Sequence, residues 1–196
     1  MQYIRGIEQY HNARPSAITL GKFDGLHQGH ELLVRRVIEH QKQDDVDGIV
    51  FAFDMSPLYQ KLNKKPDFLL SNEEKAKRLE GRVDYFIDCP FDESVSSMEA
   101  EDFIEQVLVN RFRAKYIVVG KDFCFGYQKR GNWQMLKKYE TKYGYQAEIL
   151  DKLCHNGREI SSTYIKEVLA AGDHELANQL LGYNKFEKPF DNVSKL

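Results

Sequence analysis

Two histidines in a glycine-rich segment are the residues of this chain best suited to chemistry. The segment is Gly21-Lys-Phe-Asp-Gly-Leu-His-Gln-Gly-His30. Its glycines allow a tight turn and a close approach of the backbone to a ligand, and a helix that begins near Gly29 would offer unpaired N–H groups to phosphate. His27 and His30 flank that helix start, so both imidazoles can point into one crevice. The pattern predicts a phosphate-binding loop whose histidines stabilise the charge that grows on the α-phosphate of a triphosphate.

Other interpretations of this loop are weaker. A histidine at a helix start is commonly a cap or a solvated side chain, but a pair of them among three glycines, between a strand and a helix, makes that reading unfavourable. A zinc site would need a third ligand, and none of a suitable type stands nearby. The segment lacks the Gly-Lys-Ser/Thr of a Walker loop, and it does not match the dinucleotide-binding fingerprint.

A second segment, Arg158-Glu-Ile-Ser-Ser-Thr-Tyr-Ile-Lys166, has the residue types of a phosphate site at a helix start. Ser161, Ser162 and Thr163 supply hydroxyls and N–H groups that suit terminal phosphates. Lys166 lies one turn further along and adds a positive charge. Ser-Ser-Thr before a helix is also a commonplace N-cap. This segment therefore indicates a phosphate site only in combination with the first loop.

Aromatic residues follow a later apolar run, in Val118-Val-Gly-Lys-Asp-Phe-Cys-Phe-Gly126. Phe123 and Phe125 offer flat apolar faces to a ring system, and Asp122 and Asn132 could orient its polar edges. An equally good interpretation is that one phenylalanine belongs to the core and the other covers a loop.

These segments must be positioned by short apolar runs that alternate with stretches of helical period. Most of the runs are apolar on both faces, as expected of strands covered by helices on two sides. The alternation predicts an α/β fold, a Rossmann-like doubly wound parallel sheet of about five strands, with ligands beyond the carboxyl ends of the strands. A serine followed three residues later by a glutamate predicts helix starts with a capping box at Ser71 and at Ser96. The predicted strands are 17–20, 49–53, 85–87, 116–119 and 146–150.

Composition limits the possible partners and location. The 196 residues suffice for one well-buried domain, and 28 basic against 30 acidic residues leave a net charge of −2. That balance gives no whole-protein attraction to nucleic acid or to an anionic membrane, so we expect neither partner, and the oligomeric state stays open. The chain has no secretory signal, no stretch of membrane-spanning length and no Cys-x-x-Cys pair. We therefore expect a cytoplasmic protein with reduced thiols.

With these motifs in place, the chain resembles a known group of proteins. A His-x-Gly-His element after the first strand is typical of the cytidylyltransferase and adenylyltransferase group of α/β proteins. The longer stretch from Thr19 to His30 looks specifically like the FMN adenylyltransferase module of bacterial FAD synthetases, the bifunctional riboflavin kinase/FAD synthetase family. The second segment is similar to that family's Ile-Ser-Ser-Thr-x-Ile-Arg motif, and Val118–Gly126 is similar to its Val-Gly-x-Asp-Phe-x-Phe-Gly segment.

The resemblance implies an activity and a set of site residues. The activity is transfer of AMP from ATP to FMN without a covalent intermediate, giving FAD and pyrophosphate, with Mg²⁺ held mainly through the ATP phosphates. The implied catalytic residues are His27 and His30. The implied ATP-binding residues are Gly21, Lys22, Phe23, Asp24, Gly25, Gly29, Arg158, Ile160, Ser161, Ser162, Thr163 and Lys166. The implied FMN-binding residues are Asp54, Pro57, Asp122, Phe123, Phe125, Gly126 and Asn132.

The chain departs from the family pattern at three places. Lys166 stands where arginine is usual, and a lysine keeps the charge but lacks the planar fork that grips phosphate. Lys22 stands where asparagine is common, and its charge could reach the phosphate of either ATP or FMN. Phe53-Asp-Met-Ser-Pro57 replaces Phe-x-Pro-His-Pro, so the details of the flavin site are expected to differ.

We expect one FMN adenylyltransferase domain over residues 1–183 and a polar tail or linker over 184–196, with no riboflavin kinase module in this chain. Two alternatives stay open. One is a related adenylyl- or cytidylyltransferase with another phosphorylated acceptor, and the other is a nucleotide- or flavin-binding module without turnover.

Overall fold

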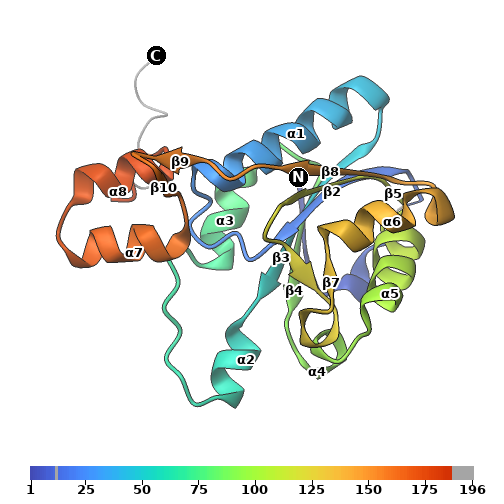
Figure 1. Ribbon diagram of the computed structural model, residues 1–196, viewed down its shortest axis with the longest axis horizontal. Helices are drawn as coiled ribbons and strands as arrows, with labels where there is room; N and C mark the ends of the chain where they lie inside the picture. Colours follow the sequence, from blue (N-terminus) through green and yellow to red (C-terminus); the bar gives the residue numbers. More distant parts are fainter. Residues whose placement is uncertain (12, 187–196) are drawn as a thin grey trace.

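The centre of the protein is one sheet of six parallel strands, in the order β1-β4-β3-β2-β5-β8 (Figure 1). The computed structural model describes residues 1–11 and 13–186. The strands are β1 (Gln2–Arg5), β2 (Ser16–Gly21), β3 (Asp47–Asp54), β4 (Tyr85–Pro90), β5 (Ala114–Gly120) and β8 (Gln146–Leu150). The order runs outward from β2 in both directions, which confirms the predicted doubly wound parallel fold.

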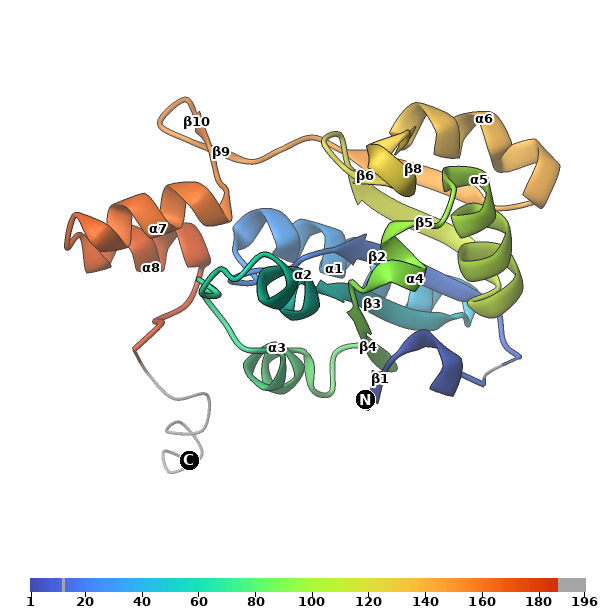
Figure 2. The same ribbon diagram turned by 90° about the horizontal axis from the view of Figure 1, so that it is seen from below.

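Helices cover both faces of the sheet (Figure 2). One face carries α1 (Gln28–Asp44) and α3 (Asn72–Leu79), and the other carries α5 (Ala100–Asp102), its π-helical continuation η2 (Phe103–Arg111), and α6 (Trp133–Tyr143). At one end, α7 (Ser162–Ala170) and α8 (His174–Leu181) pack together around a third hydrophobic cluster. The smaller elements are η1 (Ile7–Gln9), α2 (Ser56–Lys61), α4 (Glu93–Ser96), η3 (Tyr127–Lys129), and the short hairpins of β6 (Cys124–Phe125) with β7 (Gly131–Asn132) and β9 (Cys154–His155) with β10 (Arg158–Glu159).

The central strands are apolar throughout because each supplies both cores. In β3, Ile49 and Phe51 pack in the cluster beneath α6 and η2, while Val50 and Ala52 pack in the cluster beneath α1 and α3, and all four are fully buried. Successive side chains of a strand point to opposite faces, so a strand covered on both sides has no polar face. This burial holds the carboxyl end of the sheet as a fixed edge.

Two details differ from the sequence prediction. Strand β1 was missed because it lies at the edge of the sheet, where only Ile4 of its residues is buried. The capping box at Ser71 is confirmed, since Ser71 and Glu74 exchange both hydrogen bonds. The capping box at Ser96 is wrong, because Ser96 ends α4 and the next helix begins after Glu99 without a side-chain cap. There the hydroxyl of Ser97 donates to the Glu93 carbonyl, 2.6 Å away, and completes the preceding turn.

The first two residues of the polar tail expected from residue 184 contact the domain. The Lys185 backbone N–H donates to the side chain of Asn178 at 3.0 Å, and its ammonium donates to the Leu69 carbonyl at 2.5 Å. The rest of the predicted tail, 187–196, lies outside the described residues.

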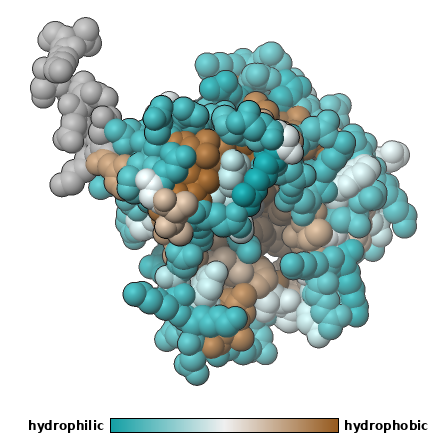
Figure 3. All heavy atoms as spheres, turned by 60° about the vertical axis from the view of Figure 1, so that its left-hand side comes forward, coloured by the Kyte–Doolittle hydropathy of each residue, from teal (hydrophilic) through white to brown (hydrophobic). Residues whose placement is uncertain are grey.

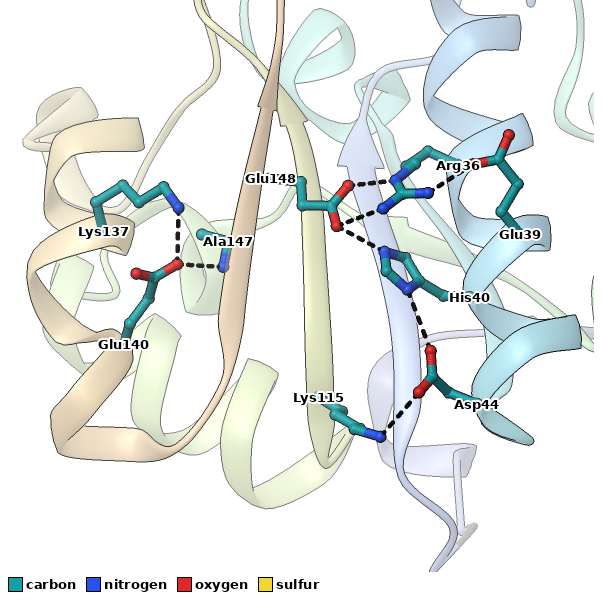
Figure 4. A network of polar contacts seen from close by, with 9 residues as sticks. All are labelled: Arg36, Glu39, His40, Asp44, Lys115, Lys137, Glu140, Ala147 and Glu148. Atoms are coloured by element: carbon teal, nitrogen blue, oxygen red, sulfur yellow. Dashed lines mark hydrogen bonds and ion pairs between the residues drawn. The ribbon is translucent and has the colours of Figure 1, made fainter.

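A charged network ties α1 to edge strand β8 of the sheet (Figure 4). Glu148 on β8 accepts hydrogen bonds from both ends of the Arg36 guanidinium, and its Oε1 lies 2.8 Å from Nε2 of His40. The His40 ring stacks on Tyr116 of β5, with ring centroids 3.7 Å apart. Since α1 begins beside His27, this network fixes the helix that carries the predicted catalytic pair.

Replacing Glu148 by glutamine should lower the free energy of unfolding by about 1–3 kcal/mol at pH 7, because Arg36 loses a charged partner in a half-buried place. The pKa of Glu148 is lowered, chiefly by the Arg36 hydrogen bond. A carboxylate whose folded pKa is depressed stabilises the fold above its unfolded value of 4.5, and this contribution disappears as the pH falls below that value. Denaturant unfolding from pH 3 to pH 7 should therefore show wild type and variant converging in acid.

The matched control is Glu39→Gln. Glu39 pairs with the same arginine, but its side chain is 53% exposed, so the change should be no more than about 0.5–1 kcal/mol. An equal loss in both variants would contradict the special role of Glu148.

Candidate active site

The first loop joins the end of β2 to the start of α1 through a strained turn. Phe23 (φ 49°), Gly25 (φ 90°) and Leu26 (φ 41°) all have left-handed backbone, which is costly for the phenylalanine and the leucine. Packing stabilises the turn, since both of those side chains are buried. The φ of Gly25 is strained for any other residue, and a Cβ added there would also lie 2.7 Å from a methyl of Leu69, so glycine is strongly favoured at this position.

The two histidines stand together where this loop becomes a helix. His27 is the N-cap residue of α1, and its ring stacks on the ring of His30 with centroids 3.7 Å apart and an interplanar angle of 22°. Both side chains line the same cleft. In the described part of the chain, neither Nδ1 atom has a hydrogen-bond partner. The pair is therefore packed in place while retaining unused polar atoms.

Burial keeps both rings neutral at pH 7. It lowers the pKa of His27 to about 4. For His30, burial comes first, and the neighbouring His27 and Lys75 then lower the pKa further, well below the ordinary value of 6.5, because a charged His30 ring would be repelled by any positive charge on them. Each neutral imidazole carries one N–H donor and one acceptor nitrogen. Such a pair can donate hydrogen bonds to phosphate oxygens without holding a net charge of its own.

The second segment lies directly against the first loop. The Ser162 hydroxyl donates to the Asp24 carbonyl at 2.7 Å, and the Lys166 ammonium lies 3.0 Å from the Asp24 carboxylate. Ser161 caps α7 by accepting from the Tyr164 N–H. Two segments more than 130 residues apart in sequence thus form one corner of the protein.

These groups surround a cleft of about 1000 Å³ at the carboxyl edge of the sheet. Figure 3 shows it as a hollow with hydrophobic side chains inside and hydrophilic ones at its rim. Of the predicted site residues, those that line it are Gly21, Lys22, Asp24, His27, Gly29, His30, Asp54, Asp122, Phe123, Phe125, Gly126, Ile160, Ser161, Ser162, Thr163 and Lys166.

Five predicted site residues do not line the cleft. Phe23 is fully buried beneath the loop, and Gly25 lies in its turn. Pro57 lies in the first turn of α2, between two residues that do line the cleft. Arg158 is exposed, stacks over Tyr164 and pairs with Glu167. Asn132 caps α6 by accepting from the Met135 N–H at 3.0 Å.

The two predicted flavin-stacking rings are packed on each other. Phe123 and Phe125 are nearly parallel, with centroids 5.6 Å apart, and Phe125 continues into the core through Phe103. Phe125 is 4% exposed and Phe123 is half-buried. Asp122 faces Lys152 across the cleft rim at 3.0 Å. Phe123 is therefore the ring of the two with a face available at the cleft.

The sequence prediction did not include Lys75, which lines the cleft from α3 and is 3% exposed. Its ammonium donates to the Lys22 carbonyl at 3.1 Å and to Asn72 Oδ1 at 3.0 Å. A signal was present, because Lys75 stands four residues before the buried Leu79 and so on the apolar side of the helix that Ser71 caps. A lysine at a core-facing position is rare unless its charge is paired, so such a position is a candidate for a functional residue.

The fold and the cleft define a doubly wound α/β protein with a paired-histidine loop after its central strand and a hydroxyl-capped helix beside it. Comparison with known proteins narrows this. The family model described as FAD synthetase matches residues 9–164. The chain belongs to the FAD synthetase family.

Curated relatives agree with this assignment. The chain is 35% identical to a bifunctional riboflavin kinase/FMN adenylyltransferase of Buchnera aphidicola, over 93% of this chain and 59% of that protein. It is 34% identical to the protein of the same name from Escherichia coli K12, over 93% and 60% of the respective chains. The chain thus spans about 60% of the length of these relatives.

A solved structure shares the fold. The crystal structure titled macrolide-efflux protein from Streptococcus pneumoniae superposes with a TM-score of 0.81 at 25% identity, over 93% of this chain and 62% of that one. In the described residues of the present chain, the helices are too short or too polar to cross a bilayer.

The neutral state of the histidine pair can be tested directly. We expect the ¹⁵N resonances of His27 to titrate with a midpoint near pH 4 and those of His30 to keep the neutral pattern from pH 8 down to pH 5.5, since burial disfavours the charged rings. NMR of protein labelled in the histidine rings measures this. Protonation of both buried rings above pH 6 would contradict the description.

Proposed function

We propose that this chain transfers AMP from ATP to FMN. A phosphate oxygen of FMN attacks the α-phosphorus of ATP, the bond to the β-phosphate breaks, and FAD and pyrophosphate leave. The observation that carries the proposal is the contact between the paired-histidine loop and the capped start of α7, which puts both in one cleft. Positioning and electrostatic stabilisation suffice for this reaction, and no covalent intermediate is needed.

The first loop and the start of α7 each have a role in holding ATP. His27 and His30 donate to the oxygens of the α-phosphate, where negative charge develops in the transition state. Ser161, Ser162 and Thr163 present hydroxyls and the N-terminal N–H groups of α7 to the outer phosphates, and Lys166 adds charge. In this structure the Lys166 ammonium contacts Asp24 and the Asp67 carbonyl, so an incoming triphosphate would replace these two partners.

FMN would occupy the part of the cleft between Phe123 and the end of β3. Phe123 supplies the apolar face, and Asp54 and Asp122 stand at the polar rim. The names of the curated relatives contain FMN adenylyltransferase, which favours FMN over other phosphorylated acceptors.

Magnesium fits the site as a companion of the ATP phosphates. Three carboxylates of the cleft are already engaged: Asp24 accepts from the Leu69 N–H, Asp54 from Ser56, and Asp88 from Tyr3. In the described residues, no group of three or more metal-ligating side chains comes together. Mg²⁺ would therefore be held mainly by phosphate oxygens and water, where it neutralises the charge of the triphosphate.

Alanine in place of His27 or His30 should reduce kcat by about 10²-fold or more, because one donor to the developing charge is lost. The assay is FAD and pyrophosphate formation from FMN, ATP and Mg²⁺, followed by chromatography. His155→Ala, on the exposed β9–β10 hairpin, is the control and should retain wild-type turnover. Unchanged turnover in both cleft variants would remove the pair from the mechanism.

The identity of the acceptor is tested by comparing the reaction rates of several candidate substrates. Nicotinamide mononucleotide, phosphopantetheine and FMN are each supplied with ATP and Mg²⁺, and products are separated. FMN should react fastest. A faster reaction with another acceptor would replace FMN in the proposal, and tight binding of ATP and FMN without pyrophosphate release would indicate a binding module.

A further inference from the structure

Lys75 has an unusual environment for a lysine. It is the one lysine or arginine in the buried set of the described residues. Other cations at the cleft, such as Arg5, Lys22 and Lys129, are exposed. Water solvates those side chains whether or not a ligand is present, whereas Lys75 has exchanged most of its water for protein neighbours.

Protein groups satisfy only part of this ammonium. Two of its three N–H donors are used by the Lys22 carbonyl and by Asn72 Oδ1. No carboxylate oxygen in the described part of the chain lies within ion-pair distance of it. Burial lowers the pKa of Lys75, while the more distant charges of Asp24, Asp88 and Asp54 oppose that shift. One donor and an uncompensated charge are left at the wall of a cleft.

A chain of hydrogen bonds holds the ammonium in position. Asn72, whose oxygen accepts from Lys75, donates its own N–H to Asp88 at 2.9 Å. Asp88, at 1% exposure, takes a second hydrogen bond from the Tyr3 hydroxyl at 2.9 Å. The chain reaches from α3 to edge strand β1, so the sheet itself fixes the direction of the charge.

Lys75 lies on the side of the cleft proposed for the acceptor nucleotide, away from the residues proposed for the ATP tail. It lies beside the first loop and close enough to His30 to lower that ring's pKa. It approaches the cleft from α3, next to the ends of β3 and β4, where Asp54 and Asp88 stand. The residues proposed for the ATP tail approach from α7 instead.

We propose that Lys75 binds the phosphate of the acceptor nucleotide and holds it beside the histidine pair. This inference rests on the proposed adenylyl transfer. The attacking oxygen belongs to that phosphate, so a fixed cation there both selects a phosphorylated acceptor and sets its approach to ATP.

The test compares two flavins that differ only by a phosphate. FMN and riboflavin are titrated onto the wild-type chain and onto Lys75→Met, with flavin fluorescence as the signal. In the wild type, FMN should bind more tightly than riboflavin. The substitution should shrink that ratio of Kd values by about tenfold to a hundredfold, the worth of a hydrogen bond between charged groups, while riboflavin affinity stays the same.

Two further variants separate binding from folding. Lys75→Gln keeps an amide that can donate to the Lys22 carbonyl but removes the charge, and it should lose the preference as Lys75→Met does. Lys138→Met, on the exposed face of α6, should keep it. Circular dichroism and thermal unfolding check that each protein is folded.

An unchanged preference for FMN in folded Lys75→Gln would overturn the inference, as would a rise in KM for ATP with KM for FMN unaltered. The proposed function stands or falls separately, on whether the wild-type chain makes FAD at all.

Discussion

The turn between β2 and α1 is the constraint on which the rest of the site depends. Its left-handed residues leave backbone carbonyls without partners in the turn itself, and three other elements supply them. Lys75 of α3 donates to the Lys22 carbonyl, Ser162 of α7 to the Asp24 carbonyl, and Tyr183 after α8 to the Gly25 carbonyl. A buried carbonyl without a partner is costly, so the loop organises the surrounding elements around itself. The residues that shape the ligand site are thus the residues that stabilise the turn.

The same turn explains why the histidines can work without charge. Phe23 anchors the loop in the core, and its ring lies 5.0 Å from that of His30. This packing removes water from both imidazoles and makes their protonation unfavourable. Neutral donors that are partly shielded from water interact more strongly with a developing negative charge than exposed donors do, since less solvent screens them. Fixed positive charge comes from Lys75 instead, so hydrogen bonding and net charge are supplied by different side chains.

Sequence reasoning reached the elements whose signal is local. The parallel sheet, the paired-histidine loop and the capped helix at Ser161 each follow from short patterns, and the structure has all three. It did not reach features that depend on long-range contacts. Strand β1 is polar because it lies at an edge, and nothing in its own residues reveals that Tyr3 will meet Asp88. Asn132 has the residue type of a ligand contact, but the structure uses its oxygen as a helix cap, a role that only the start of α6 makes visible. Lys75 was overlooked because a lysine on an amphipathic helix is normally a solvated residue.

Lys166 and Lys75 differ in burial, and this difference suits them to different roles in the cleft. Lys166, 27% exposed, pairs with Asp24 at 3.0 Å and can turn from that partner toward phosphate, because its own side chain is partly in water. Lys75 cannot move or resolvate, since Asn72 and the Lys22 carbonyl hold it and the core surrounds it. An adaptable cation suits the triphosphate tail, which must leave as pyrophosphate after every turnover. A fixed cation suits the group whose angle of approach determines whether the bond forms. The replacement of arginine by lysine at position 166 affects the adaptable end, where loss of a planar fork changes binding strength more than the geometry of attack.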